Sequence, residues 1–571
     1  AGDISSVFDK TAKRELLFAP ARLAIQTEIP SDWPAWNMDW KDRMNPPRAH
    51  VGGPAKIHVV ENGPVRAAVE VTREAENSIF VQTIRLAAGG AGDRLEVANK
   101  VDWQGKMSCL KVEFPLTVTN QMATYNWELG KIERGNNNPA KYEVPSHQWF
   151  DLTDRSGDYG VSILTDYKYG SDKPADTLLR LTLLYTPGVL SRWYEQRWQD
   201  WGRHEFTYAI YGHPNGWRQG KSDWQALRLG QPLLAFSTTS HEGKLGRSFS
   251  ILHLDSDQIA VRALKLAEDR DQAIIRLQEL NGTNASSVNL TTAAGITSAT
   301  EVNGVETPLH PLEKSDAALK LDFTPYQIRS LALDLKSPAH LTPPACTPVD
   351  LSYDLTAFTP SGTQTTGGFD DQGGTMPSEM IGDTVVSEGI TFKIGSRSAG
   401  QKNAVTCHGQ TINLPPGPHN RIYLLAAATA DTKGDFKVDN QAVTLGIQKW
   451  TGYIGQWDNR AFKGDVSEMA YVVTNELDHI DNGYIKRDAL GWFCSHRHLS
   501  DGSDGIYQYS YLFKYRLDAS NDSKTLTLPD NPAIRIVAIT VAQNDNDSTL
   551  PVQPLYDDFT GRPPVTLRTD P

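Results

Sequence analysis

Three groups of residues in this sequence have the types and spacing that chemistry requires, and the first contains a cysteine and two histidines. Cys494, His496 and His498 alternate in the segment CSHRH. In an extended strand they project to the same side, a geometry that could hold a metal ion. Because this spacing alone is a loose criterion, a hydrogen-bonded or ligand-facing histidine pair is the preferred interpretation. No metal ligands are assigned in this chain.

The second group is a pair of carboxylates in the segment WNMDWKDR. Asp39 and Asp42 stand three residues apart. Glycoside hydrolysis uses two carboxyl groups about 5–10 Å apart across a cleft, and three residues of loop can span that distance. Many other acidic pairs in the chain could do the same, so salt-bridging or turn-capping roles are the better interpretation of these residues alone.

The third group consists of polar and aromatic side chains next to expected strands. Such positions are where binding and catalytic sites are built on rigid scaffolds. The plainer alternative is that acidic and basic side chains pair across a hairpin. The members are Asp166, Lys168 and Tyr169 after a strand expected at 159–164, and Arg203 and His204 before a strand expected at 205–211.

The elements that must position these residues are β-strands, because hydrophobic residues recur with period two. Val65, Ala67, Val69 and Val71 alternate with polar residues directly after Asn62-Gly63, a hairpin turn signal. Similar alternation recurs along the chain between Gly, Asn, Asp and Pro residues, and no long amphipathic helix stands out. The sequence therefore predicts an all-β protein built from antiparallel sheets with one buried face.

A proline-rich segment divides the chain near its middle, and the sequence pattern changes beyond it. Residues 337–349 hold four prolines in the segment SPAHLTPPACTPV, and sheet pairing is expected to stop there because proline cannot donate ladder hydrogen bonds. Beyond this linker, aromatic residues alternate from Tyr507 to Tyr515 on one expected face, and Ile534–Val541 reads as a doubly buried strand. This pattern predicts a second all-β unit, most simply a two-sheet sandwich.

Composition excludes several classes of partner. The 571 residues carry a formal net charge of −12 and no basic run, so neither nucleic acid nor an anionic membrane surface is expected as a partner. Apolar stretches are far shorter than the roughly 20 residues of a membrane-spanning helix. The four cysteines are far apart and form no disulfide framework. Eleven of the 14 tryptophans lie at or before Trp224, which suits either core packing or stacking on sugar rings.

Long ordered segments resemble the C-terminal half of glycoside hydrolase family 38, the class II α-mannosidases, with the bacterial branch and the cytosolic and vacuolar-type members most similar. The likeness runs from Ile4 to about Leu335. The segments are ISSVFDKTAKREL, NWELGKIERGNNNPAKYEVPSHQWFDL, GVSILTDYKYGSDKPADTLLRLTLLYTPG, QDWGRHEFTYAIYGH, AEDRDQAIIRLQELNG and FTPYQIRSLALDL. Residues 350–571 resemble, more weakly, a jelly-roll accessory module of bacterial glycosidases.

The resemblance implies a fold and a division into domains. The expected parts are a mutarotase-like antiparallel super-sandwich at 1–255, a small β-sandwich at 256–336, the linker at 337–349 and a jelly-roll β-sandwich at 350–571 that could bind carbohydrate. The opening AGDISSVFDK looks like the point at which the family enters its β half. The chain is therefore expected to be a fragment, a processed chain or one product of a split.

The resemblance also implies a function, the retaining hydrolysis of α-linked mannose in an oligosaccharide or glycan. In the family, a zinc ion and two catalytic aspartates sit in an N-terminal barrel, so zinc ligands and catalytic residues are expected outside this chain, and the chain alone is expected to be inactive. Loops of the β half close over one side of the sugar site. The residues carried over as substrate-facing are Trp36, Asp39, Asp166, Lys168, Tyr169, Arg203 and His204, and the surface around Trp36 and Lys168 is expected to be apolar and aromatic.

Two rival functions remain open. The chain could be a stand-alone carbohydrate-binding protein without catalysis, with the C-terminal module as the binder. It could also be a lyase that uses Tyr169, His204 and Arg203, although the basic cleft that binds a uronate does not suit an acidic chain. The sequence is compatible with an oligomer, and it favours a bacterial periplasmic or secreted location over the cytoplasm without deciding between them.

Overall fold

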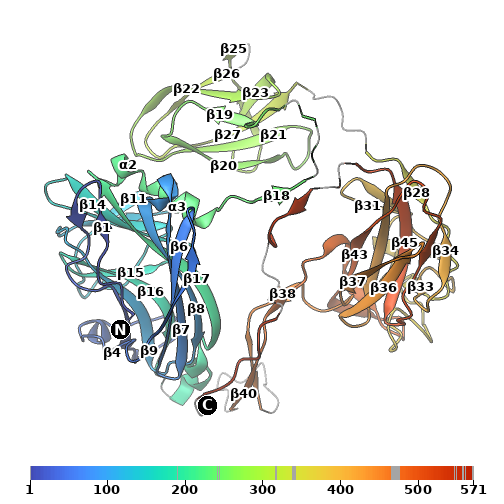
Figure 1. The fold of residues 1–571 in the computed structure, drawn as a ribbon, viewed down its shortest axis with the longest axis horizontal. Helices are drawn as coiled ribbons and strands as arrows, with labels where there is room; N and C mark the ends of the chain where they lie inside the picture. Colours follow the sequence, from blue (N-terminus) through green and yellow to red (C-terminus); the bar gives the residue numbers. More distant parts are fainter. Residues whose placement is uncertain are drawn as a thin grey trace.

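The computed structural model describes residues 2–568 apart from 190, 239, 241, 244, 316–317, 337–342, 464–475, 546, 548, 556–558 and 560. The described chain forms three β-sandwich bodies, as the sequence predicted (Figure 1). The N-terminal sandwich is blue to teal, the small sandwich green, and the C-terminal sandwich orange to red. Among the described residues, no helix is both long and apolar enough to cross a membrane.

The N-terminal sandwich pairs a nine-stranded with a six-stranded antiparallel sheet. The larger sheet has the order β11 (Lys131–Arg134), β10 (Ala123–Asn126), β13 (Trp149–Thr153), β14 (Tyr159–Thr165), β17 (Gly202–Pro214), β8 (Arg94–Trp103), β7 (Ser78–Ala87), β6 (Arg66–Ala75) and β5 (Lys56–Asn62). The smaller has the order β12 (Val144–Pro145), β15 (Gly170–Ala175), β16 (Leu178–Thr186), β9 (Ser108–Pro115), β3 (Arg22–Thr27) and β4 (Ala49–His50). A short hairpin of β1 (Phe8–Asp9) and β2 (Arg14–Glu15) precedes them.

The core of this sandwich lies between the two sheets, where the apolar side of each alternating strand is buried. Strand β14 is buried along its whole length, because a helical segment covers the outer face of the large sheet there. The covering elements are α2 (Trp217–Gly220) and α3 (Ser222–Gly230), whose Trp217 and Ala226 pack with Trp149 and Leu164. A further short helix, α1 (Trp40–Arg43), follows β3.

A buried ionic cluster crosses the six-stranded sheet. Lys111 on β9 and Asp172 on β15 are almost completely inaccessible to solvent, and the lysine Nζ lies 3.0 Å from the Asp172 carboxylate. Arg180 on β16 donates to the same carboxylate from its Nε at 3.1 Å. The cluster ties three neighbouring strands together through charges that water cannot reach.

Gly220 at the end of α2 is required by a buried histidine. The ring of His213 is fully buried, and its Nε2 lies 2.8 Å from Asp151 and 3.1 Å from the Ser162 hydroxyl. A Cβ added at Gly220 would stand 2.4 Å from Cγ of that ring. The ring is held from its other edge by the hydrogen bonds, so it cannot move away.

Replacing Gly220 with alanine is therefore expected to destabilise the sandwich, although alanine is the better helix former. Overpacking costs about 1–3 kcal/mol, which exceeds the gain of about 1 kcal/mol in helix propensity. Hydrogen exchange at β14 and β17 should speed up. The matched control is Gly230→Ala in α3, where nothing lies within 4 Å of the added Cβ, and exchange should stay unchanged or slow down. Equal protection in the two variants would contradict the steric argument.

The small sandwich also has two antiparallel sheets and a core of its own. One sheet has the order β19 (Leu252–Leu254), β22 (Ala285–Thr292), β26 (Ala318–Phe323) and β25 (Lys314–Ser315). The other has the order β20 (Ile259–Leu266), β21 (Ala273–Glu279), β27 (Ile328–Leu335), β23 (Ile296–Val302) and β24 (Pro308–Pro311).

The C-terminal sandwich contains a six-stranded and a four-stranded sheet. The larger has the order β28 (Cys346–Pro348), β45 (Ile534–Ala542), β35 (Arg421–Ala428), β43 (Asp504–Asp518) and β42 (Ala489–His498), with β33 (Val405–Thr406) also paired to β45. The smaller has the order β34 (Thr411–Asn413), β44 (Thr525–Thr527), β36 (Thr432–Val438) and β37 (Gln441–Ile447). Two-stranded pairs flank them: β29 (Phe358–Thr359) with β30 (Met376–Pro377), and β31 (Thr384–Ser387) with β32 (Ile390–Lys393).

Two details differ from what the sequence suggested. Of the expected linker, residues 337–342 lie outside the described residues, and sheet pairing resumes already within it, because β28 pairs with β45. Pro348 is tolerated there since β28 is an edge strand.

In β43, Tyr507 is 77% exposed and has a φ of +59°. It therefore does not share the buried face of Tyr511 and Phe513.

Segments late in the chain return to the N-terminal sandwich. Hairpins formed by β38 (Gly455–Gln456) with β41 (Tyr484–Ile485) and by β39 (Asn459–Phe462) with β40 (Leu477–Asp481) extend from the C-terminal sandwich (Figure 1). Leu477 and Ile480 of β40, and Val565 near the chain end, belong to the N-terminal core. A short pair of β18 (Phe236–Ser237) and β46 (Leu550–Pro551) adds another link. These contacts cross the predicted division between 1–255 and 350–571.

Candidate functional site

The loop between β14 and β15 is fixed against the neighbouring strand β17. The Asp166 carboxylate accepts hydrogen bonds from the backbone amides of Thr207 and Tyr167, each at 2.7 Å. The Lys168 ammonium lies over the ring of Phe206, 4.6 Å from its centroid. The loop therefore presents a carboxylate and a cation in fixed positions beside β17.

Burial shifts the pKa values of Asp166, Lys168 and His204 in the direction that favours the neutral form of each side chain. It raises the pKa of Asp166, against the hydrogen bond from Thr207. It lowers the pKa of Lys168, although Asp200 and Asp166 act in the opposite direction. Burial also lowers the pKa of His204, whose Nε2 lies 2.7 Å from the Asp200 carbonyl oxygen. The structure thus brings Asp166, Lys168 and His204, which the sequence placed beside strand ends, into one cluster of interacting charges.

Asp200 belongs to this cluster but was not among the predicted site residues. It has a φ of +60°, and its carboxylate accepts the amide of Tyr185 at 2.9 Å. The signal that could have found it is its place in the segment QDWGRHEF, three residues before Arg203.

A second predicted group lies on the loop between β3 and α1. Trp36 is 86% exposed, whereas the neighbouring Trp33 packs on Trp193 with ring centroids 4.8 Å apart. Burial alone would raise the pKa of Asp39, but hydrogen bonds from the hydroxyl and amide of Ser31 hold it below its ordinary value. The loop is therefore rigid at its base and offers one bare indole face.

Tyr185 links the two groups. Its amide binds Asp200, and its hydroxyl donates to the Asn37 carbonyl at 2.8 Å. Tyr185 therefore contacts both the loop that carries Trp36 and Asp39 and the Asp200 carboxylate beside Lys168. Of the expected aromatic surface, Trp36 is bare, but Lys168 is half-buried against Phe206.

Tyr169 points into a separate aromatic group. Its ring meets the edge of the His147 ring at 6.0 Å, and His147 in turn packs on Trp127 at 5.1 Å. Tyr169 is half-exposed there. The tryptophans at 198 and 201, by contrast, are buried in the core and carry no exposed ring face.

Arg203 is engaged by a distant part of the chain. Its backbone amide and Nε approach one carboxylate oxygen of Asp458 at 3.0 and 3.1 Å. Its other guanidinium nitrogens donate to the side chain of Asn482 at 2.8 Å and to the carbonyl of Pro563 at 2.6 Å. The guanidinium of Arg203 is therefore held by residues from the C-terminal part of the chain, whereas Tyr169 lies in the separate aromatic group of His147 and Trp127.

Known protein families match the three β-sandwiches of the chain separately. The model described as glycosyl hydrolases family 38 C-terminal domain matches residues 1–189, and that of the family 38 C-terminal beta sandwich domain matches residues 258–331. These two parts of the chain are similar to the C-terminal domains of glycoside hydrolase family 38. Residues 345–545 match a different model, an AziU2-like beta-sandwich domain.

Relatives of the family 38 parts are named as α-mannosidases. Alpha-mannosidase 2C1 of Mus musculus is 30% identical over 322 residues, which are 54% of this chain and 30% of the relative. Alpha-mannosidase G of Dictyostelium discoideum is 27% identical over 58% of this chain and 31% of its own. The chain thus spans about a third of the length of the curated relatives it matches. A crystal structure of an alpha-mannosidase from Enterococcus faecalis V583 covers 58% of this chain and 40% of its own, with 19% identity and a TM-score of 0.46.

Proposed function

We propose that this chain is the C-terminal β-domain part of a retaining α-mannosidase that acts on mannose-containing glycans together with an N-terminal catalytic barrel of the same enzyme. The observation that carries the proposal is the match of two different family 38 C-terminal models in their chain order. The names of the curated relatives support the substrate class.

The zinc of the proposed enzyme would be held by the barrel. Among the described residues of the N-terminal sandwich, no group of histidine, cysteine, aspartate or glutamate side chains has the spacing of a metal site. When bound, such a zinc ion acts as a Lewis acid on substrate oxygens. The contribution of this chain would be to bind and orient the sugar.

Two features of the N-terminal sandwich suit that role. The bare indole of Trp36 offers a rigid apolar face of the kind that stacks on the C–H face of a sugar ring. Lys168 and Asp166 offer a donor and an acceptor for sugar hydroxyls, in positions fixed by Phe206 and by the Thr207 amide. Arg203, because it is engaged by Asp458, would act as a structural residue at the edge of the site.

The proposal is tested by hydrolysis of an aryl α-mannoside. The chain alone, with added zinc, is expected to give no turnover, whereas a protein that joins it to a family 38 barrel should turn over and lose activity with a chelator. Chelator-sensitive turnover by the chain alone would contradict the proposal, because the active site would then lie within these residues.

Replacing Lys168 with methionine in the joined enzyme is expected to lower kcat/KM about 10- to 150-fold, since a hydrogen bond from a charged group is worth about 1.5–3 kcal/mol. Methionine keeps most of the stem that packs on Phe206. The matched control is Lys56→Met on the edge strand β5, which is exposed and should leave kcat/KM unchanged. Equal rates in both variants would remove Lys168 from the proposed site.

A further inference from the structure

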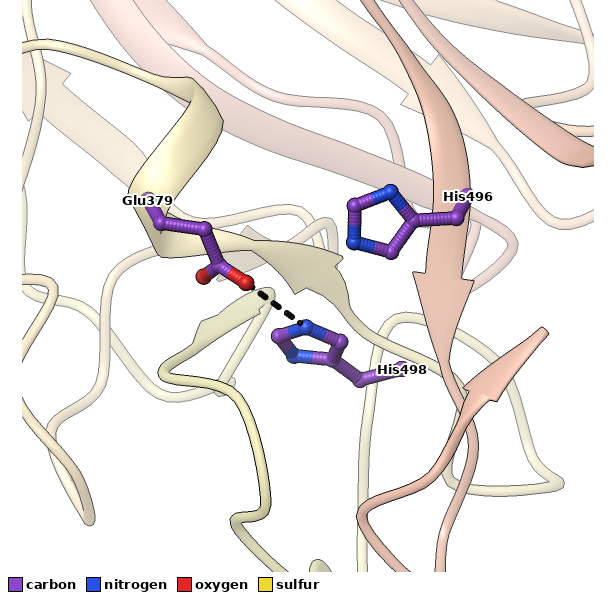
Figure 2. Close-up of side chains that lie close together, drawn as sticks. All are labelled: Glu379, His496 and His498. Carbon is purple, nitrogen blue, oxygen red and sulfur yellow. Dashed lines mark hydrogen bonds and ion pairs between the residues drawn. The ribbon is translucent and has the colours of Figure 1, made fainter. Parts of the chain in front are cut away.

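The C-terminal sandwich contains a cluster of potential metal ligands that the proposed mannosidase function does not use. Figure 2 shows Glu379, on a single 3₁₀ turn (Ser378–Met380), facing His496 and His498 at the end of β42. One potential ligand atom from each of the three side chains lies within 4.8 Å of the others. This is the one such group among the described residues of the chain.

His498 is held rigidly with one ring nitrogen pointed at the cluster. Its side chain is fully buried, and its backbone pairs with Thr375 in both directions, at 2.9 and 3.0 Å. Nδ1 lies 3.0 Å from the hydroxyl of Thr359, which itself lies 2.6 Å from the hydroxyl of Thr375. A polar partner on the second nitrogen is what orients metal-binding histidines and sets their tautomer.

The other nitrogen of His498 meets only carboxylates. Nε2 lies 3.1 Å from Oε1 of Glu379 and 3.6 Å from Oδ1 of Asp504. Ligand atoms around a tetrahedral zinc ion, with bonds of about 2.0–2.2 Å, are separated by about 3.3–3.6 Å. The distance between Glu379 and His498 is thus close to that between two ligands of one zinc ion, and the Asp504 carboxylate lies beside this pair.

His496 reaches the same place because β42 and β43 are irregular there. The two histidine rings lie 5.7 Å apart, and the pairing register shifts between Cys494 and His496. Bulges of this kind re-aim side chains and are frequent beside functional sites. Cys494 is left out of the cluster, since its Sγ lies in the core, 3.8 Å from the Ser510 carbonyl.

The arginine between the two histidines does not face the proposed metal position. Arg497, between the two histidines, turns its guanidinium to the other side, over the ring of Trp450 at 5.2 Å and near Asp370 at 3.9 Å. Two neutral imidazoles and one or two carboxylates would balance most of the charge of a divalent ion.

We propose that Glu379, His496 and His498 form a binding site for a divalent first-row transition-metal ion of the zinc class. Two ring nitrogens with one carboxylate oxygen are a ligand set that such ions accept. Three protein ligands leave at least one position for Asp504, water or an external ligand. The site lies in the AziU2-like domain and does not depend on the proposed mannosidase activity. The proposal differs from the sequence-based interpretation, which assigned no metal ligands in this chain.

The test is zinc binding by the untagged full chain after removal of metals. Titration of Zn²⁺ against a chromophoric chelator should show one site with a dissociation constant in the micromolar range or below, and Co²⁺ should give visible d–d absorption at the same stoichiometry. His496→Ala and Glu379→Gln should each weaken zinc binding at least about tenfold. Because these two side chains are less buried than His498, both variants should fold, which circular dichroism checks.

His408→Ala is the matched control, since His408 is an exposed histidine of the same sandwich outside the cluster, and it should bind zinc like the unmodified chain. Two results would overturn the proposal. One is the absence of a stoichiometric site in the unmodified chain. The other is unchanged affinity in folded His496→Ala and Glu379→Gln variants, which would place the zinc elsewhere.

Discussion

Asp172→Ala is expected to destabilise the N-terminal sandwich by about 3–5 kcal/mol, because it removes the shared partner of two buried cations. Lys111 would keep Glu143 and the Thr182 hydroxyl, and Arg180 would keep Glu113, at the edge of the cluster. The thermal unfolding transition of this sandwich, followed by hydrogen exchange in β9 and β16, measures the loss. The matched control is Arg155→Ala, which removes an exposed ion pair with Asp176 in the same sandwich and should leave the transition unchanged. Equal shifts in the two variants would contradict the expected role of the buried cluster.

The effect of Asp172→Ala should also depend on pH in one direction. Burial alone would raise the pKa of Asp172, but Lys111 and Arg180 hold it well below its ordinary value. A carboxyl group with a lowered pKa in the folded state contributes stability above its unfolded pKa of about 3.9, and loses that contribution as pH falls towards the folded pKa. The difference between the unmodified chain and the variant should therefore be full above about pH 4 and narrow below it. A difference that grows on acidification would contradict this assignment.

Asp458→Ala is expected to release the hairpins of residues 455–485 from the N-terminal sandwich. Arg203 would keep only two neutral acceptors, the side chain of Asn482 and the carbonyl of Pro563. Leaving a largely buried guanidinium without its carboxylate costs about 2–3 kcal/mol, so hydrogen exchange in β39 and β40 should speed up about 30- to 150-fold. The pKa of Asp458, which burial raises and Arg203 lowers, ends below its ordinary value. The contact should therefore persist down to mildly acidic pH.

The control for this contact lies on the same hairpin. Lys463 and Glu476 form an ion pair at 3.2 Å, and both side chains are more than half exposed. Lys463→Ala should leave exchange in β39 and β40 unchanged. If Asp458→Ala also leaves it unchanged, the apolar contacts of Leu477 and Ile480 with the core would be sufficient to hold the hairpins.

Much of the fold follows from local patterns in the sequence. The alternation at residues 65–71 after Asn62-Gly63 predicted the hairpin that the structure forms as β5 and β6. The buried run at 534–541 became β45, which is buried throughout. The sequence also placed Asp166, Lys168 and His204 beside strand ends, and they lie close together because their strands, β14 and β17, pair with each other.

The tertiary structure decided what local patterns leave open. The register shift beside His496 exposes Tyr507, because period two predicts a shared face only while the pairing is uninterrupted. The contact of Arg203 with Asp458 could not be predicted from the sequence, since the two residues are 255 positions apart.

The sequence by itself determined the all-β class, the strands and the family 38 likeness, because side-chain alternation and turn residues act over a few positions. It also placed two histidines of the CSHRH segment on one strand face. Whether they have a third ligand depended on Glu379, 119 positions from His498, arriving on a turn that only the packed sandwich brings to β42. Contacts between residues far apart in the sequence are fixed by how the sheets pack over a common core. The spacing of nearby residues does not predict that packing.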